Sequence, residues 1–138
     1  LCFQGDTMRL THVRLLVDDF DACLGFYRDT LRLPLALEAG DGVYAEFDAG
    51  DATLALYRRD LMSHVVGAVD NVTPSDSDDV VITFAVDGAD ETVQELRDRG
   101  VEFVTGAHDQ DAWMIRVAHF RDPDGHLIEI YAPIQPPE

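Results

Sequence analysis

Two related segments of the chain lie 69 positions apart, and this internal repeat constrains the fold more than any other feature. Residues 12–29, HVRLLVDDFDACLGFYRD, align with residues 81–98, VITFAVDGADETVQELRD. With five additional residues in the second copy, LALY at 54–57 aligns with IEIY at 128–131. Because the elements match in the same order at both ends of each copy, we interpret the chain as a duplication of one structural unit.

Hydrophobic periodicity predicts the same βαβββ unit in both copies. In the first copy we expect strands near 10–17, 43–48 and 52–58 and a helix over 20–31. In the second we expect a strand near 80–86, a helix over 89–99, and strands near 101–105, 113–120 and 126–132. The sequence therefore predicts an α+β fold with modules at about 8–60 and 80–132, joined by a linker at 61–79.

The composition is that of one folded domain with an acidic surface. The 138 residues are 46% hydrophobic, and 27 acidic residues against 10 basic ones give a formal charge of −17. Such a surface repels phosphate backbones and anionic lipids, so we expect neither a nucleic-acid nor a membrane partner. With no long apolar run and no secretory pattern, we expect a cytoplasmic protein.

The first seven residues are interpreted as the remnant of an expression tag. LCFQG resembles the end of a protease site, and Met8 is the expected natural start. Cys23 is then the only native cysteine, so no disulfide framework is expected.

Strand alternation separates an apolar face from a polar one in each copy. In the first strand, Val13, Leu15 and Val17 should pack under the helix, which leaves His12 and Arg14 on the opposite face. By the same rule, Ile128 and Ile130 pack inward. Four equivalent positions converge if the two sheets curve toward each other, and they form the candidate site: His12, Val81, Ala55 and Glu129.

The segments THVRLLVDDFDACLGFYRDTLRLPL and FRDPDGHLIEIY resemble the vicinal oxygen chelate superfamily, which includes glyoxalase I, extradiol dioxygenases, fosfomycin-resistance enzymes and bleomycin-resistance proteins. The resemblance covers nearly the whole chain after Met8. It implies two βαβββ modules that form a cupped mixed sheet. It is weak evidence for an activity, because members share the scaffold and differ in reaction.

In metal-dependent members of that superfamily, the resemblance implies ligands at four positions, the start of the first strand and the end of the last strand in each module. His12 and Glu129 match two of them, whereas Val81 and Ala55 occupy the others and cannot coordinate a metal. Two protein ligands rarely retain a transition metal, so no cofactor is expected; if a metal is bound, its ligands are His12 and Glu129. The remaining histidines lie at no family ligand position: His64, His108, His119 and His126.

Charge and aromatic residues complete the predicted site. The carboxylate of Glu129 needs a cationic partner, either Arg14, a protonated His12 or the ligand. At the offset of 69, Tyr44 aligns with Trp113, and either ring can stack on a planar ligand. Asp122 and Asp124 are explained by a tight turn and receive no catalytic role. The predicted ligand-binding residues are His12, Arg14, Tyr44, Ala55, Tyr57, Val81, Trp113 and Glu129.

Three functions are compatible with these residues. The favoured one is a homodimeric small-molecule-binding protein that sequesters a planar or cationic, antibiotic-like ligand without turnover. The alternative is a metal-dependent lyase, isomerase or dioxygenase whose missing ligands come from another histidine, a partner subunit or the substrate. The third is a metal-free enzyme in which His12 is a base oriented by Glu129; it ranks last because no nucleophile adjoins them.

Overall fold

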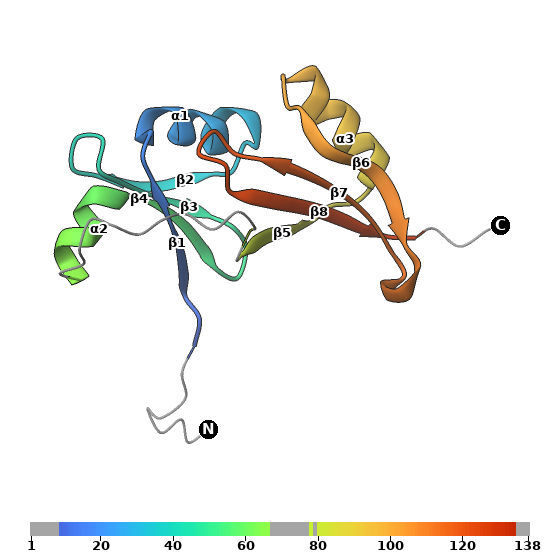
Figure 1. The fold of residues 1–138 in the computed structure, drawn as a ribbon, viewed down its shortest axis with the longest axis horizontal. Coiled ribbons are helices and arrows are strands. Elements are labelled where there is room, and N and C mark those ends of the chain that lie inside the picture. The colour runs from blue at the N-terminus through green and yellow to red at the C-terminus, as the bar shows by residue number, and fades with distance from the viewer. Residues whose placement is uncertain (1–8, 67–77, 79, 135–138) are drawn as a thin grey trace. The chain divides into compact units, whose positions relative to one another are not determined.

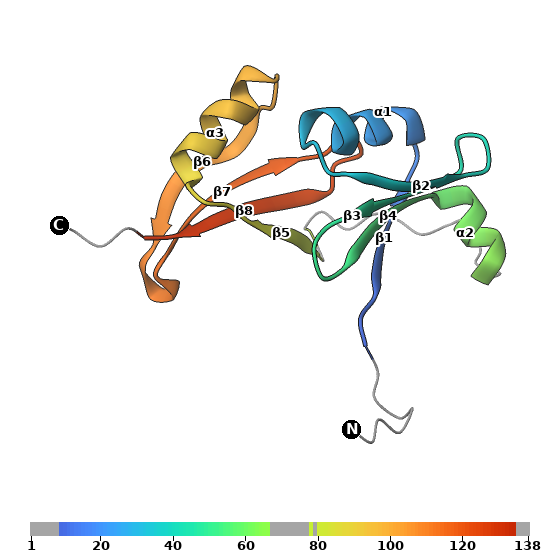
Figure 2. The same ribbon diagram turned by 180° about the vertical axis from the view of Figure 1, so that it is seen from behind.

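The computed structural model describes residues 9–66, 78 and 80–134, without the side chains of residues 63–66 and 113. The chain divides into two compact units, one ending at Asp70 and the other beginning at Asn71. Each contains one four-stranded mixed sheet with helices (Figures 1 and 2). The predicted α+β class is confirmed.

The first unit contains one copy of the predicted βαβββ module and a further helix. Its sheet has the order β1-β4-β3-β2, in which only the β1–β4 pair is parallel. The helices are α1, continued by a π-helical segment, and α2. The elements are β1 (His12–Val17), α1 (Phe20–Gly25), the π-helical segment (Phe26–Thr30), β2 (Leu35–Ala39), β3 (Tyr44–Asp48), β4 (Thr53–Arg58) and α2 (Arg59–Val66).

The second unit repeats the topology. Its strands follow the order β5-β8-β7-β6, again with one parallel pair, β5–β8. The elements are β5 (Val81–Ala85), α3 (Ala89–Asp98), β6 (Phe103–Gln110), a 3-10 turn (Asp111–Trp113), β7 (Ile115–Arg121) and β8 (Leu127–Pro133). None of the helices within the described ranges is long and apolar enough to cross a membrane.

Helix α1 shows how the sequence directs one face of a sheet into the core. Asp19 caps the helix, because its carboxylate accepts a hydrogen bond of 3.1 Å from the backbone N–H of Ala22. The buried stripe of this helix and the π-helical segment consists of Phe20, Cys23, Leu24 and Tyr27. The helix packs against β4, and Leu15 and Val17 of β1 are buried on the same face of the sheet, as alternation predicted.

Two elements differ from the prediction. Strand β2 was not predicted, because all five of its residues are exposed and its apolar residues do not mark a buried face. It is an edge strand that pairs only with β3. Helix α2, of eight residues, occupies part of the predicted linker. The turn-forming and charged residues of this region had favoured a loop.

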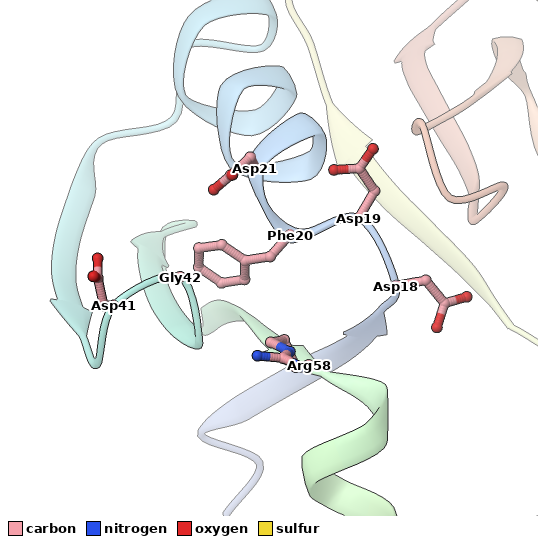
Figure 3. A pocket seen from close by; sticks show the side chains of 7 residues that line it. All are labelled: Asp18, Asp19, Phe20, Asp21, Asp41, Gly42 and Arg58. Atoms are coloured by element: carbon pink, nitrogen blue, oxygen red, sulfur yellow. The ribbon is translucent and has the colours of Figure 1, made fainter.

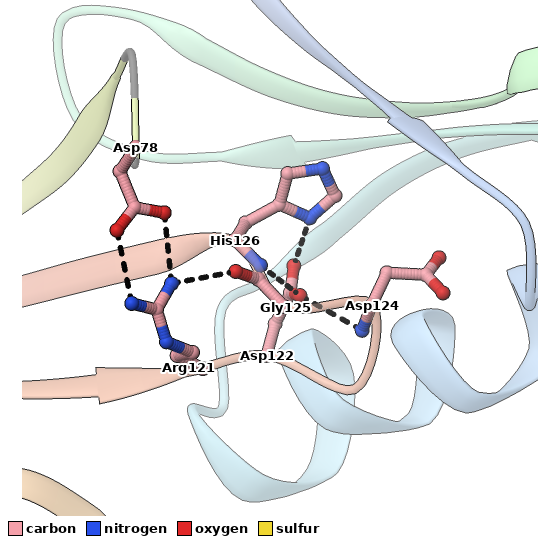
Figure 4. Close-up of polar contacts among 6 residues, drawn as sticks. All are labelled: Asp78, Arg121, Asp122, Asp124, Gly125 and His126. Carbon is pink, nitrogen blue, oxygen red and sulfur yellow. Dashed lines mark hydrogen bonds and ion pairs between the residues drawn. The ribbon is translucent and has the colours of Figure 1, made fainter. Parts of the chain in front are cut away.

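A buried aspartate organises the turn between β7 and β8 (Figure 4). Asp122 Oδ1 accepts from the backbone N–H groups of Asp124 and His126, at 3.0 and 2.9 Å, and its Oδ2 lies 2.7 Å from Nδ1 of His126. Gly125 adopts φ +90°, a conformation that L side chains rarely adopt, and donates its N–H to the carbonyl of Asp122. The structural role predicted for this aspartate is confirmed.

Replacing Asp122 with alanine should lower the free energy of unfolding by about 2–4 kcal/mol, because three hydrogen bonds to a fully buried carboxylate are lost together. Asp51→Ala is the matched control, since Asp51 is an exposed loop aspartate and should change stability by less than about 0.5 kcal/mol. Urea denaturation measures both. Equal stabilities for the two variants would contradict the role given to Asp122.

Candidate ligand-binding faces

In each module, one face of the sheet is covered by a helix and the opposite face carries the predicted site residues. In β1, Leu15 and Val17 are buried, whereas Arg14 is exposed and His12 is half-buried. In β8, Ile128 and Ile130 are buried and Glu129 is half-buried. The alternation predicted for these strands is confirmed. We call the two opposite faces the first and second polar faces.

A continuous polar chain crosses the first polar face. The Glu46 carboxylate accepts a 2.5 Å hydrogen bond from the Tyr44 hydroxyl and lies 3.2 Å from Nε2 of His12. Arg14 donates from Nε to the same hydroxyl at 3.5 Å, and its guanidinium carbon lies 5.8 Å from the Tyr44 ring centre. Four side chains from β1 and β3 are thus linked in the order Arg14, Tyr44, Glu46, His12.

Glu46 is the residue of this face that the sequence analysis missed. In β3 it lies two positions beyond Tyr44, so the alternation of YAEFD already places both side chains on one face. The strand register adds that Ala55 lies opposite both Glu46 and Arg14. Ala55 is completely buried, and its methyl group offers no donor atom.

Burial and hydrogen bonding change the acidity of this chain. The pKa of Tyr44 is raised above its ordinary value of 10.0, first by burial and then by the hydrogen bond to Glu46. The hydrogen bond to Tyr44 raises the pKa of Arg14. At neutral pH the phenol is therefore a neutral donor and the guanidinium is charged.

The second polar face has its own histidine–carboxylate pair. His119 Nε2 lies 2.9 Å from Glu129 Oε1, and His119 Nδ1 lies 2.7 Å from the Thr105 hydroxyl. Because these residues lie opposite one another in adjacent strands, they form one row across β6, β7 and β8. The ring of His108 lies 6.0 Å from that of His119.

The partner predicted for Glu129 requires correction. We expected Arg14, a protonated His12 or the ligand to compensate the carboxylate, and His119 was set aside because it lies at no family ligand position. Within the second module, His119 is the partner, because β7 lies directly beside β8 and the register places the two side chains opposite each other. Arg14 contacts Tyr44 in the first module.

The predicted correspondence of Tyr44 with Trp113 is also wrong. Tyr44 lies opposite Tyr57, whereas the residue opposite Tyr131 is Val117. Val117 is therefore the structural counterpart of Tyr44. The longer second copy shifts the register after its first helix, so Trp113 falls in a 3-10 turn before β7 and not in a strand.

Several predicted residues stay untested as parts of one site. Val81 begins β5 and is 43% exposed. The side chains of Trp113 and His64 lie outside the described part of the chain. His12 and Ala55 belong to the first module and Val81 and Glu129 to the second, so their convergence stays a prediction.

The donor set does not fit the metal site of the superfamily. In the described part of the chain, no three or more histidine, cysteine, aspartate or glutamate side chains are grouped so as to hold a metal ion. Among the described residues, each polar face has one bonded imidazole–carboxylate pair, His12 with Glu46 and His119 with Glu129. Ala55 and Val81 offer no donor. Retention of a transition metal normally needs three or four protein ligands.

A hollow of about 560 Å³ lies in the first module at the start of α1 (Figure 3). Two of the four carboxylates that line it have structural roles: Asp18 pairs with Arg59, and Asp19 caps the helix. Arg58, at its edge, pairs with Asp60. We therefore assign it no ligand. The lining residues are Asp18, Asp19, Phe20, Asp21, Asp41, Gly42 and Arg58.

The repeated βαβββ modules and the polar faces define a protein built on the vicinal oxygen chelate scaffold. Residues 9–130 match the family described as Glyoxalase/Bleomycin resistance protein/Dioxygenase superfamily, and the chain belongs to this superfamily. It is 38% identical to the uncharacterized protein YraH of Bacillus subtilis (strain 168) over 125 residues. The aligned region covers 90% of this chain and 98% of YraH.

Solved structures share the fold. A glyoxalase/bleomycin resistance protein/dioxygenase from Nocardioides superposes with a TM-score of 0.78 at 23% identity, over 96% of this chain and 88% of that one. A lactoylglutathione lyase from Agrobacterium tumefaciens gives a TM-score of 0.72 at 21% identity, over 91% and 94%. At these identities the similarity shows the fold alone.

The ionisation of Tyr44 tests the polar chain of the first face. The difference in absorbance at 295 nm between the wild type and Tyr44→Phe should titrate with a midpoint above pH 10 in the native protein. In urea the same difference should titrate at about pH 10. Because the folded pKa is raised, the stabilisation is present below pH 10 and is lost as pH rises through the folded value. A native midpoint at or below 10 would contradict the hydrogen-bonded arrangement.

Proposed function

We propose that this protein binds a planar organic molecule on its polar faces and holds it without turnover. The observation that carries the proposal is the state of the family's four ligand positions. Ala55 and Val81 have no donor atoms, and His12 and Glu129 are each bonded to a side chain of their own module. What these faces offer a ligand is hydrogen bonding and aromatic surface.

The first polar face is the better candidate for a planar ligand. The rings of Tyr44 and Tyr57 meet edge to face with their centres 5.9 Å apart, and both side chains are half-buried. Such a pair presents a ring face beside polar groups, which suits an aromatic molecule. In the second module Val117 replaces the first ring of this pair, opposite Tyr131.

The preference for a cationic ligand is weaker than the sequence suggested. It depended on an uncompensated carboxylate at Glu129. With His119 at 2.9 Å and Thr105 bonded to that imidazole, the carboxylate has a partner inside the module. Planarity, not positive charge, is the property we retain for the ligand.

A second candidate function is acid–base catalysis without a metal. His119 is held between a hydroxyl and a carboxylate, and a carboxylate that orients an imidazole is a common arrangement of a general base. The Cys23 thiol is not an accessible nucleophile for such a reaction, because it lies in the core and is fully buried. Conversion of a bound ligand that disappears in His119→Gln would favour this candidate.

The proposal is tested by titrating planar aromatic compounds into the protein in EDTA, with calorimetry for affinity and mass spectrometry for the recovered ligand. We expect binding that survives chelation and a ligand of unchanged mass. Tyr57→Leu should weaken binding by about 1 kcal/mol, roughly fivefold. Tyr131→Leu, at the equivalent position of the second module, is the comparison and should weaken binding less, because Val117 replaces the first ring of the pair there.

Two results would contradict the proposal. Binding that requires an added divalent metal, together with metal that is lost in His12→Ala, would support the metalloenzyme alternative. Conversion of every bound compound to a product would show that the protein is an enzyme.

A further inference from the structure

Arg14 differs from most other arginines of this chain in its partners. All ten basic residues are arginines, in a sequence with 27 acidic ones. Among the residues that the structure describes, six of these arginines form ion pairs with carboxylates: Arg28, Arg58, Arg59, Arg99, Arg116 and Arg121. Within the same described residues Arg14 forms no ion pair, and its hydrogen bond and ring contact are both with Tyr44.

The strand register explains why this guanidinium has no carboxylate partner. Arg14 lies opposite Ala55, and Ala55 in turn lies opposite Glu46, so an uncharged methyl group separates the two charged residues on the face. The Glu46 carboxylate is bonded to Tyr44 and His12. Within the described part of its module, the terminal nitrogens of Arg14 therefore have no hydrogen-bond acceptor.

A guanidinium with two unbonded terminal nitrogens fits a planar oxyanion. Its N–H groups form a fork that matches the two oxygens of a carboxylate, and such bidentate pairs are stronger than neutral hydrogen bonds. Nε of Arg14 lies 3.5 Å from the Tyr44 hydroxyl and its guanidinium carbon lies 5.8 Å from the ring centre, and these two contacts favour one orientation of the group. Arg14 is exposed, so its fork is accessible in its own module.

We propose that Arg14, Tyr44 and Tyr57 form a subsite for the carboxylate of a planar aromatic acid. Arg14 binds the carboxylate, and the two tyrosine rings contact the aromatic part. This inference rests on the proposed function and specifies its ligand class. A chain with a net charge of −17 repels an anionic ligand at long range. At physiological salt, however, the field of distant charges is screened beyond about 8 Å, whereas the guanidinium acts at contact.

The acidity of Tyr44 is consistent with this subsite. A phenol whose pKa lies above the ordinary value stays neutral at physiological pH and adds no negative charge beside the bound anion. Its proton is donated to Glu46, so its oxygen accepts from Arg14 and does not compete for the arginine's terminal nitrogens.

The test uses three probes of the same shape and different charge: 2-naphthoate, 2-naphthamide and 2-naphthylmethylammonium. Calorimetry at 0.15 M salt should show the acid binding at least about tenfold more tightly than the amide, and the ammonium compound binding most weakly. Arg14→Gln should reduce the affinity for the acid to that for the amide and leave the amide unchanged. Arg14→Lys, which keeps the charge and removes the fork, should lie between.

Arg28→Gln is the matched control, because Arg28 is an exposed arginine of the same module that is already paired with Asp29. It should preserve the preference for the acid. Equal affinities for acid and amide in the wild type, or an equal loss of both in Arg14→Gln, would overturn the subsite while the planar-ligand proposal stands. Failure of all three probes to bind would instead show that the rings of Tyr44 and Tyr57 do not bind a planar aromatic molecule. That result would contradict both the subsite and the proposed function.

Discussion

The two-residue repeat of a β-strand is the constraint on which the rest of this structure depends. Because neighbouring side chains point to opposite faces, burying Leu15 and Val17 under a helix directs Arg14 and Leu16 to the other face. Polar groups that cannot enter the core collect there, and those that are partly buried must be bonded. In the described part of the chain, no buried side-chain nitrogen or oxygen lacks a hydrogen-bond partner.

The two modules satisfy this requirement with different residues. At equivalent positions of the parallel strand pair, the first module has Arg14 opposite Ala55, and the second has Thr83 opposite Glu129. The adjacent strand then supplies Glu46 in one and His119 in the other. Each module thus pairs an imidazole with a carboxylate, but from different strands. The two modules therefore share a scaffold and differ in the chemistry of their polar faces.

Alternation and the internal repeat were sufficient to predict the described strands other than β2, the helical segments of α1 and α3, and the face on which His12 and Glu129 lie. They were insufficient where the pattern carries no burial signal, as in β2, whose residues are all exposed. Cross-strand partners such as Glu46 and His119 depend on register, which a one-residue shift changes completely. Trp113 was misassigned for the same reason, because added residues in the second copy moved the register.

In this account, His12 and His119 are each held by a carboxylate of their own module. Nuclear magnetic resonance of the imidazole groups in carboxylate variants tests it directly. Glu129→Gln should move the imidazole signals of His119, and Glu46→Gln should move those of His12, because the bonded pairs are His119 with Glu129 and His12 with Glu46. Unchanged His119 signals in Glu129→Gln, or unchanged His12 signals in Glu46→Gln, would contradict the account.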